Sequence, residues 1–177
     1  MNAAQAAATH GERSPEETRT RVLRWQDPLA LAESGARMDG LSYLRAIAAG
    51  ELPPPPIAVL LNFSVVEVER GRAVFAGEPA EEHYNPIGSV HGGLAATLID
   101  SATGCAVHST LPAGVGYTTL GLEVKFVRPI GRETERVRAE AQVVHRGRRQ
   151  ATAEARLIDP ATEKLLATAT TTCLIIG

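Results

Sequence analysis

The pattern of apolar and polar positions changes its period part-way along the chain. In the N-terminal third, Leu41, Leu44 and Ile47 fall on one stripe of a 3.6-residue period. Asp39 is a typical N-cap before that stripe and Gly50 a typical stop after it. Beyond the proline-rich stretch that follows, apolar and polar residues alternate with a period of two, apart from one long apolar stretch. The sequence therefore predicts short helices first, and then strands around a single buried helix.

Two further helices and a connector are predicted before residue 60. Ser14-Pro15-Glu16-Glu17 is typical of a helix start and predicts a helix from 14 to about 25. Asp27-Pro28 is a second helix-start signal and Gly35 is typical of a helix end, so a second helix is predicted between them. Pro53-Pro54-Pro55-Pro56 favours polyproline II and predicts a stiff connector. Residues 1–13 have no periodicity and are expected to be disordered.

The rest of the chain predicts an antiparallel sheet and one long helix. The strands are expected at 63–69, 72–76, 120–126, 136–143, 150–157 and 165–176, and the helix at 91–109. The links between the later strands, including residues 129–132, have hairpin lengths, which favours antiparallel pairing. The inward positions of these strands are often alanine, which lets a helix lie close to the sheet. We expect an α+β fold in which five to six strands wrap the helix. Residues 61–177 are expected to form this domain, and residues 1–60 an N-terminal extension to it.

Composition narrows the class of protein. The 177 residues hold 18 Lys and Arg against 20 Asp and Glu, a net charge of −2, which argues against a dedicated nucleic-acid binder. There is no apolar run long enough to span a membrane and no signal peptide, so we expect a cytoplasmic protein without a membrane partner. The two cysteines are far apart and are expected to be reduced. The five histidines lack metal-ligand spacing, so no metal is expected.

Candidate chemistry is concentrated in residues 85–100. Asn85 precedes a helix that opens with Gly92 and Gly93, where unpaired N–H groups and the helix dipole favour a polarised carbonyl oxygen. Asp100 puts a carboxylate on an otherwise apolar helix, which is costly unless the group is paired or used. The plainer interpretations are a turn at Asn85, close packing at the glycines, a buried anchor at Asp100 and a loop-orienting His91. Phosphate-binding glycine loops and the G-x-S-x-G motif of serine hydrolases are absent from the sequence.

This segment resembles the hotdog-fold acyl-CoA thioesterases of the phenylacetic-acid-degradation type. The family pattern N-x-x-G-x-x-H-G-G-x-x-x-x-L-x-D falls here on Asn85, Gly88, His91, Gly92, Gly93, Leu98 and Asp100. The resemblance implies that Asn85 and the Gly92 N–H polarise a thioester carbonyl. It also implies that Asp100 acts through water or attacks directly, and that Thr118 assists. It covers residues from about 57 onward, so it implies no role for the extension.

One geometric point does not depend on the family. Gly92 and Asp100 are eight residues apart, about 12 Å along a helix axis, too far to serve one carbonyl from one chain. A two-fold homodimer with antiparallel helices solves this, because Gly92 then faces Asp100 of the partner subunit. Family resemblance favours pairing of the dimers into a homotetramer.

The substrate is then expected to be an acyl-CoA, with no retained cofactor. The candidate substrate-binding residues are His91, Gly93, Arg128, Arg146, Arg148 and Arg149. For the arginines, plain solvation on hairpins is an equally good interpretation. A non-catalytic acyl-CoA binder or sensor on the same fold is the alternative function, although such a protein could dispense with Asp100. A hotdog hydratase is a third alternative, but its expected Asp and His order is not seen.

Overall fold

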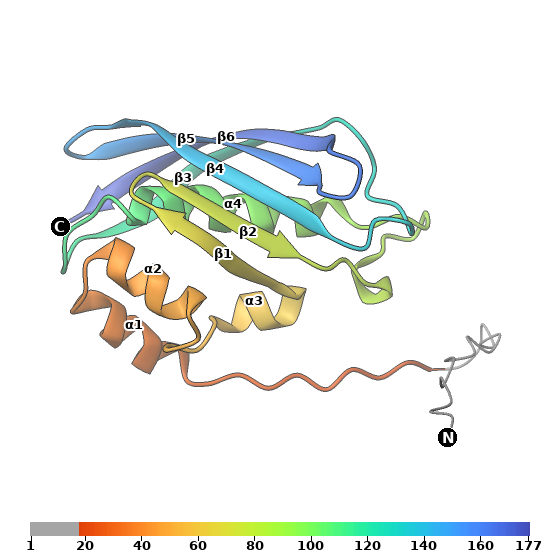
Figure 1. The fold of residues 1–177 in the computed structure, drawn as a ribbon, viewed down its shortest axis with the longest axis horizontal. Helices are drawn as coiled ribbons and strands as arrows, with labels where there is room; N and C mark the ends of the chain where they lie inside the picture. The colour runs from red at the N-terminus through yellow and green to blue at the C-terminus, as the bar shows by residue number, and fades with distance from the viewer. Residues whose placement is uncertain (1–17) are drawn as a thin grey trace, which may run out of the picture.

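The computed structural model describes residues 18–177 as a sheet with one long helix against it and three shorter helices beyond its edge (Figure 1). The helices are α1 (Pro28–Ala36), α2 (Gly40–Ala48), α3 (Pro56–Leu61) and α4 (Gly92–His108), with a 3-10 turn at Glu81–His83. The strands are β1 (Phe63–Glu69), β2 (Arg72–Gly77), β3 (Gly116–Phe126), β4 (Val137–Arg146), β5 (Gln150–Asp159) and β6 (Lys164–Ile176). The predicted α+β class and the hotdog arrangement are confirmed.

The six strands form one antiparallel sheet in the order β1-β2-β4-β5-β6-β3. β3 pairs with β6, from Gly116 opposite Ile176 to Phe126 opposite Ala167, and so forms one edge of the sheet. The expectation that residues 129–132 make a hairpin is therefore wrong. The segment between β3 and β4 crosses from the edge to the middle of the sheet, because β4 pairs with β2 and β5 instead.

The apolar helix α4 packs on the sheet as the alternation predicts. Leu98, Ile99 and Ala102 are fully buried on the helix. The facing strands present small side chains, and Ala139, Ala141, Ala151, Ala153 and Ala155 are all buried. These small residues on the sheet let the helix backbone approach closely, and Leu98 and Ile99 fill the space between the helix and the sheet.

The extension contains two of its predicted helices. The Asp27 side chain accepts from the Leu29 N–H at 2.8 Å at the start of α1, and Asp39 accepts from the Ser42 N–H at 3.1 Å at the start of α2. Both carboxylates satisfy backbone donors that a helix N-terminus leaves free, and both lie at the positive end of the dipole. The expected start signals at Asp27-Pro28 and Asp39 are confirmed.

The helix predicted from 14 to 25 is wrong over residues 18–25, which contain no helical residue. The Arg21 guanidinium instead donates to the carbonyls of Val59 and Leu60, both at 3.1 Å, and contacts Glu82 at 2.7 Å. These tertiary contacts hold the segment extended and outweigh its local preference. The start of that helix and the disorder expected at 1–13 lie outside the described residues.

The proline-rich connector ends earlier than expected. Pro55 has φ −65° and ψ 149°, as in polyproline II, but Pro56 is the first residue of α3. Proline suits that position because its missing N–H has no intrahelical partner. The chain division at residue 60 stays a prediction. Among residues 18–177, no helix is both long and apolar enough to cross a membrane.

Candidate active site

A compact loop precedes α4 and is shaped by Asn85. The Asn85 Oδ1 accepts from the N–H groups of Ile87 and Ser89, both at 3.1 Å, and its Nδ2 donates to the Ser89 Oγ at 2.9 Å. Gly88 has φ +85°, a conformation that favours glycine. The turn-forming interpretation of Asn85 thus describes these contacts, and one Nδ2 hydrogen is left for a further acceptor.

His91 and Gly93, both expected to bind substrate, contact each other. His91 is the N-cap of α4, and its Nδ1 accepts from the Gly93 N–H at 2.8 Å. This bond requires an Nδ1 without a proton, so a neutral His91 carries its proton on Nε2. The loop-orienting interpretation of His91 fits this geometry, and the Gly93 N–H is not free for a ligand.

The backbone N–H of Gly92, at the start of α4, is free to bind a ligand. No group within residues 18–177 accepts a hydrogen bond from it, as expected for the first residue of a helix. Gly92 lines an apolar pocket of about 430 Å³, together with Phe126 and Arg128. A Cβ at Gly92 would lie 3.0 Å from the Phe126 Cζ, so glycine also permits this close approach of strand β3.

Asp100 lies two turns further along α4 and is held by strand β3. The Thr119 Oγ1 donates to the Asp100 Oδ1 at 2.9 Å, the only side-chain or backbone donor to this carboxylate in the described chain. Asp100 and Thr119 both line a second, larger pocket of about 1020 Å³. The Asp100 carboxylate is therefore oriented by a hydroxyl and faces open space.

Within the chain, Asp100 contacts Thr119 and not Thr118, the residue expected from the resemblance. Thr118 is exposed, whereas Thr119 is half-buried and faces α4. The physical reason is a register shift between Thr119 and Gly121, which places Leu120 outward and reverses the alternation. Gly121 within the strand was the one sequence signal of this bulge.

Gly92 and Asp100 do not meet within one chain. They line different pockets, and eight residues of helix separate them by about 12 Å. The separation predicted from spacing is thus present in the fold.

Two further titratable groups lie beside Asp100. Burial raises the pKa of the Cys105 thiol to about 12, against a lowering by its hydrogen bond with Tyr117. Burial also raises the pKa of the Tyr117 hydroxyl well above its usual value. Both groups therefore stay protonated near neutral pH, and Cys105 is a poor thiolate nucleophile.

The four candidate arginines divide into two places. Arg128 lines the Gly92 pocket, and its Nη1 donates to the Leu165 carbonyl at 2.8 Å. Arg146, Arg148 and Arg149 belong to the β4–β5 hairpin, where the Arg149 carbonyl accepts from the Ile175 N–H. Leu166, near the other end of β6, lines the Gly92 pocket. From Ile175 to Leu166 is nine residues of strand, or about 30 Å, so the hairpin lies far from Gly92. The fold brings only Arg128 to Gly92.

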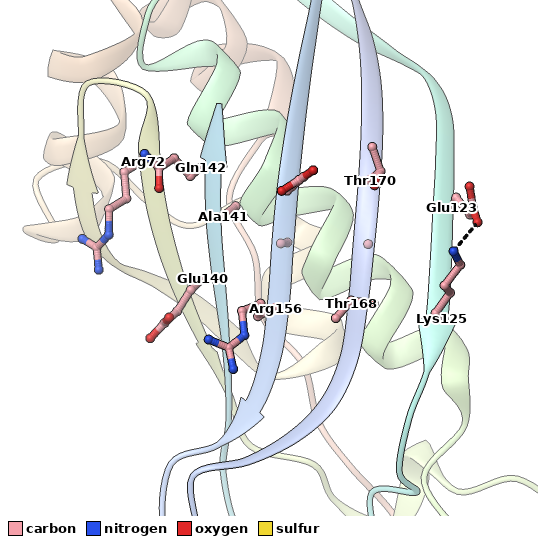
Figure 2. Close-up of a pocket in the computed structure, with 12 residues that line it drawn as sticks. Arg72, Glu123, Lys125, Glu140, Ala141, Gln142, Arg156, Thr168 and Thr170 are labelled. Carbon is pink, nitrogen blue, oxygen red and sulfur yellow. Dashed lines mark ion pairs between the residues drawn. The ribbon is translucent and has the colours of Figure 1, made fainter. Parts of the chain in front are cut away.

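A third hollow, of about 420 Å³, lies across strands β4, β5 and β6 on the sheet and contains neither Gly92 nor Asp100. Its labelled side chains include Glu140, Arg156 and Thr170, and Lys125 pairs with Glu123 at 3.2 Å along one side (Figure 2). This charged and threonine-lined surface does not bring together the groups that a carbonyl reaction needs. Residues 18–177 also contain no group of three His, Cys, Asp or Glu side chains arranged for a metal ion.

Comparison with known proteins identifies the family. The family model of the thioesterase superfamily matches residues 87–165. Human acyl-coenzyme A thioesterase 13 is 30% identical over 109 residues, 62% of this chain and 76% of that protein. The 1,4-dihydroxy-2-naphthoyl-CoA hydrolase of Listeria monocytogenes is 31% identical over 107 residues, 60% of this chain and 84% of that protein. A shorter match, 43% identical over 76 residues, spans 42% of this chain and about half (48%) of a Halobacterium salinarum protein described as an esterase.

Solved structures agree with these relatives. A thioesterase-type, phenylacetic acid degradation-related protein of Ralstonia eutropha has a TM-score of 0.67 and 30% identity, covering 75% of this chain and 98% of its own. A mutant form of the phenylacetic acid degradation protein PaaI of Thermus thermophilus has a TM-score of 0.60 and 31% identity, covering 67% of this chain and 97% of its own. Together with the six-stranded sheet and its single long helix, these matches lead to one conclusion: this chain belongs to the thioesterase superfamily and has the hotdog fold.

Proposed function

We propose that this protein hydrolyses acyl-CoA thioesters to a free acid and CoA, at a site that two chains share. The observation that carries the proposal is a pair of groups on α4: a free helix N-terminal N–H at Gly92, and a carboxylate at Asp100 oriented by Thr119. One group is suited to a developing oxyanion, and the other to a water molecule. The names of the relatives support CoA thioesters as the substrate class.

The proposed reaction needs only these groups and water. Asp100 accepts one proton from water while the water oxygen attacks the thioester carbon. The carbonyl oxygen becomes negative and is stabilised by the Gly92 N–H and by the positive end of the α4 dipole. The C–S bond then breaks, and the CoA sulfur leaves with the proton that Asp100 held. Asn85 shapes the loop and offers its remaining amide hydrogen to the same oxygen.

Sharing between chains follows from the two pockets. A carbonyl on Gly92 cannot lie within about 3 Å of a water on Asp100 of the same chain, because the groups are about 12 Å apart along α4. If two α4 helices pack antiparallel across a two-fold axis, Asp100 of the partner subunit lies opposite Gly92. The two sites of a dimer are then equivalent, and each takes one group from each chain.

Strand β3 is the surface that favours this dimer. It is an edge strand of 11 residues, and an unpaired edge of that length invites pairing with another chain. Leu120 and Phe126 on β3, and Val127 just after it, are 61%, 59% and 48% exposed. Pairing of β3 with its own copy would satisfy the unpaired backbone groups of this edge, place side chains of the partner beside these apolar residues, and continue the sheet from one chain into the other.

The Gly92 pocket is proposed as the entrance for the CoA arm. Its apolar walls suit the thioester and pantetheine, and Arg128 at its edge suits a CoA phosphate. Arg146, Arg148 and Arg149 could contact the same CoA only from the partner subunit, because they lie at the far end of their own sheet.

A thiol-release screen tests the proposal. Purified protein is incubated with short-chain, long-chain and aryl acyl-CoAs in the presence of EDTA, and free CoA is measured with a thiol reagent. We expect thiol release from at least one substrate, with the same rate after zinc is added. Binding of acyl-CoA without thiol release from any substrate would overturn the proposal in favour of a non-catalytic acyl-CoA binder.

Direct attack by Asp100 would use the same two groups through an anhydride. Hydroxylamine present during turnover separates the two routes, because it converts an anhydride at Asp100 to a hydroxamate that peptide mass spectrometry detects. Water activation, the route proposed here, leaves the Asp100 peptide unmodified.

A further inference from the structure

The pocket that contains Asp100 extends well beyond the reacting groups. It has a volume of about 1020 Å³, more than twice that of the Gly92 pocket. Pockets for drug-sized ligands span about 300–1,000 Å³, so this one is at the upper end of that range. Water and an acetyl group would leave most of it empty, which indicates that a larger group enters from the Asp100 end.

One wall of this pocket comes from the extension before β1. Leu44 and Ile47 on α2, together with the segment that runs from the end of α2 through Pro55, line it. The sheet contributes Phe63 and Phe75, whose rings lie 6.1 Å apart, and Tyr117 on β3. Most of the side chains that line the pocket are apolar; the polar ones are Asp100 with its neighbours Ser101 and Thr119, and Gln26, Glu51 and Ser64.

Packing fixes the extension in this place. Leu44 is buried, and Ala46 on the same helix is also buried. Arg45 donates to the Val68 carbonyl at 3.3 Å and so ties α2 to strand β1. Ile47, by contrast, is only half-buried and lines the open space. The wall is therefore part of the folded domain, and Ile47 is a position where its shape can be changed without removing a core residue.

We infer that this pocket receives the acyl group, and that the extension selects bulky apolar acyl groups over acetyl. The inference rests on the proposed function, because the acyl carbon must reach the water held by Asp100. The CoA arm then lies in the Gly92 pocket of one chain, and the acyl group lies in the extension-walled pocket of the chain that supplies Asp100. Residues outside the minimal hotdog thus determine the substrate class.

A chain-length series with matched variants tests the inference. The substrates are acetyl-, hexanoyl- and decanoyl-CoA, and kcat/KM is measured by thiol release. Each buried methylene contributes up to about fourfold. We therefore expect decanoyl-CoA to exceed acetyl-CoA by about 100-fold or more in the unmodified protein.

Ile47→Trp fills the pocket from the extension side and is expected to lower the decanoyl-to-acetyl ratio at least tenfold. Ile47→Ala enlarges the pocket and is expected to retain the preference for long chains. The control is Leu29→Trp on α1, which adds the same side chain at a position that is 72% exposed and does not line the pocket. The control should keep the ratio within twofold, and thermal melting confirms that each variant folds.

An unchanged ratio in folded Ile47→Trp, or equal kcat/KM for all three substrates, would overturn the inference while leaving acyl-CoA hydrolysis in place. Calorimetric titration of Asp100→Asn with CoA and with decanoyl-CoA provides a readout that needs no turnover. We expect the decanoyl chain to tighten binding and the added Ile47→Trp substitution to remove that gain. If the chain adds no affinity over CoA, the acyl group lies elsewhere and the inference is wrong, whether or not the protein is a hydrolase.

Discussion

The Thr119 Oγ1 donates a 2.9 Å hydrogen bond to the Asp100 Oδ1, which ties edge strand β3 to the middle of α4. Hydrogen bonds to charged groups contribute about 1.5–3 kcal/mol, enough to decide how a carboxylate is oriented. Thr119 touches Asp100 and is proposed to act through it, so it is a positioning residue. The neighbouring Thr118 is exposed and provides a matched comparison on the same strand.

Thr119→Val keeps the shape of the side chain and removes its hydroxyl. We expect kcat to fall about tenfold or more with little change in KM, because the substitution alters the orientation of the Asp100 carboxylate and not the substrate pockets. Steady-state kinetics of Thr119→Val and Thr118→Val give the comparison. A larger loss of kcat in Thr118→Val would restore the role that the family resemblance gives to that residue.

Asp100→Asn preserves volume and removes the proposed base. General base catalysis contributes about 10²–10⁴-fold, so kcat for thiol release should fall by that factor. Circular dichroism and thermal melting should show an intact fold, since Thr119 can still donate to the amide oxygen. Turnover close to that of the unmodified protein would reduce Asp100 to a structural anchor.

Much of the fold could be predicted because it rests on local signals. The N-caps Asp27 and Asp39 fix the starts of two helices, and the period-two alternation fixes the strands. What failed depends on contacts between distant residues. The segment around Arg21 has a local preference for helix, but the hydrogen bonds of Arg21 to α3 hold it extended. The pairing of β3 with β6 makes β3 an edge strand. Both contacts join segments that are far apart in the sequence, so no local pattern indicates them.

The candidate site divides in the same way. The order of Asn85, Gly92 and Asp100 is visible in the motif, but the hydroxyl that reaches Asp100 is not. Within the chain, a single bulge at Gly121 brings the hydroxyl of Thr119, and not that of Thr118, to Asp100. A shift of one position turns a strand residue to the other face, so spacing alone cannot assign it. The part of the extension that lines the Asp100 pocket carries no sequence motif, because many apolar residues of suitable size could form such a wall. The sequence therefore does not predict it.

His108 makes the stability of the fold depend on pH. Its ring lies 5.7 Å from that of Tyr43 and 5.4 Å from that of Tyr117, and burial lowers its pKa below 6.5 despite an opposing effect of Asp39. Below pH 6.5 the unfolded chain therefore binds a proton that the folded chain resists. The free energy of unfolding has the full His108 contribution above that pH and loses it as the pH falls through the lowered pKa.

His108→Gln places an uncharged side chain at that position. Urea unfolding at pH 7.5 and pH 5 should show a smaller loss of unfolding free energy in this variant than in the unmodified protein. Every other titratable group is the same in both proteins, so the comparison isolates His108. Equal losses in the two proteins would mean that His108 is not held in its neutral form.

The exposed apolar edge of β3 predicts an assembly larger than one chain. Light scattering at micromolar concentration should give two or four times the chain mass of 18.7 kDa. A mass of one chain would contradict both the pairing of β3 and the shared site that depends on it.

The shared site has a sharper test in two variants that are each defective in one group. Gly92→Pro removes the free N–H. The substitution suits the first residue of a helix, and His91 before it already has ψ 133°, as a residue before proline requires. Gly92→Ala is the matched control, because it adds the same Cβ near Phe126 but keeps the N–H. We expect Gly92→Pro to lose about 10²–10³-fold more kcat than Gly92→Ala.

The most direct measurement is the activity of mixed dimers of Gly92→Pro and Asp100→Asn, each inactive as a homodimer. Random pairing makes half of the dimers mixed, and each mixed dimer has one doubly defective site and one intact site. The shared site therefore predicts recovery to about one quarter of the unmodified activity. A site built within one chain predicts no recovery, since every chain is defective. Absence of thiol release in verified mixed dimers would contradict the account.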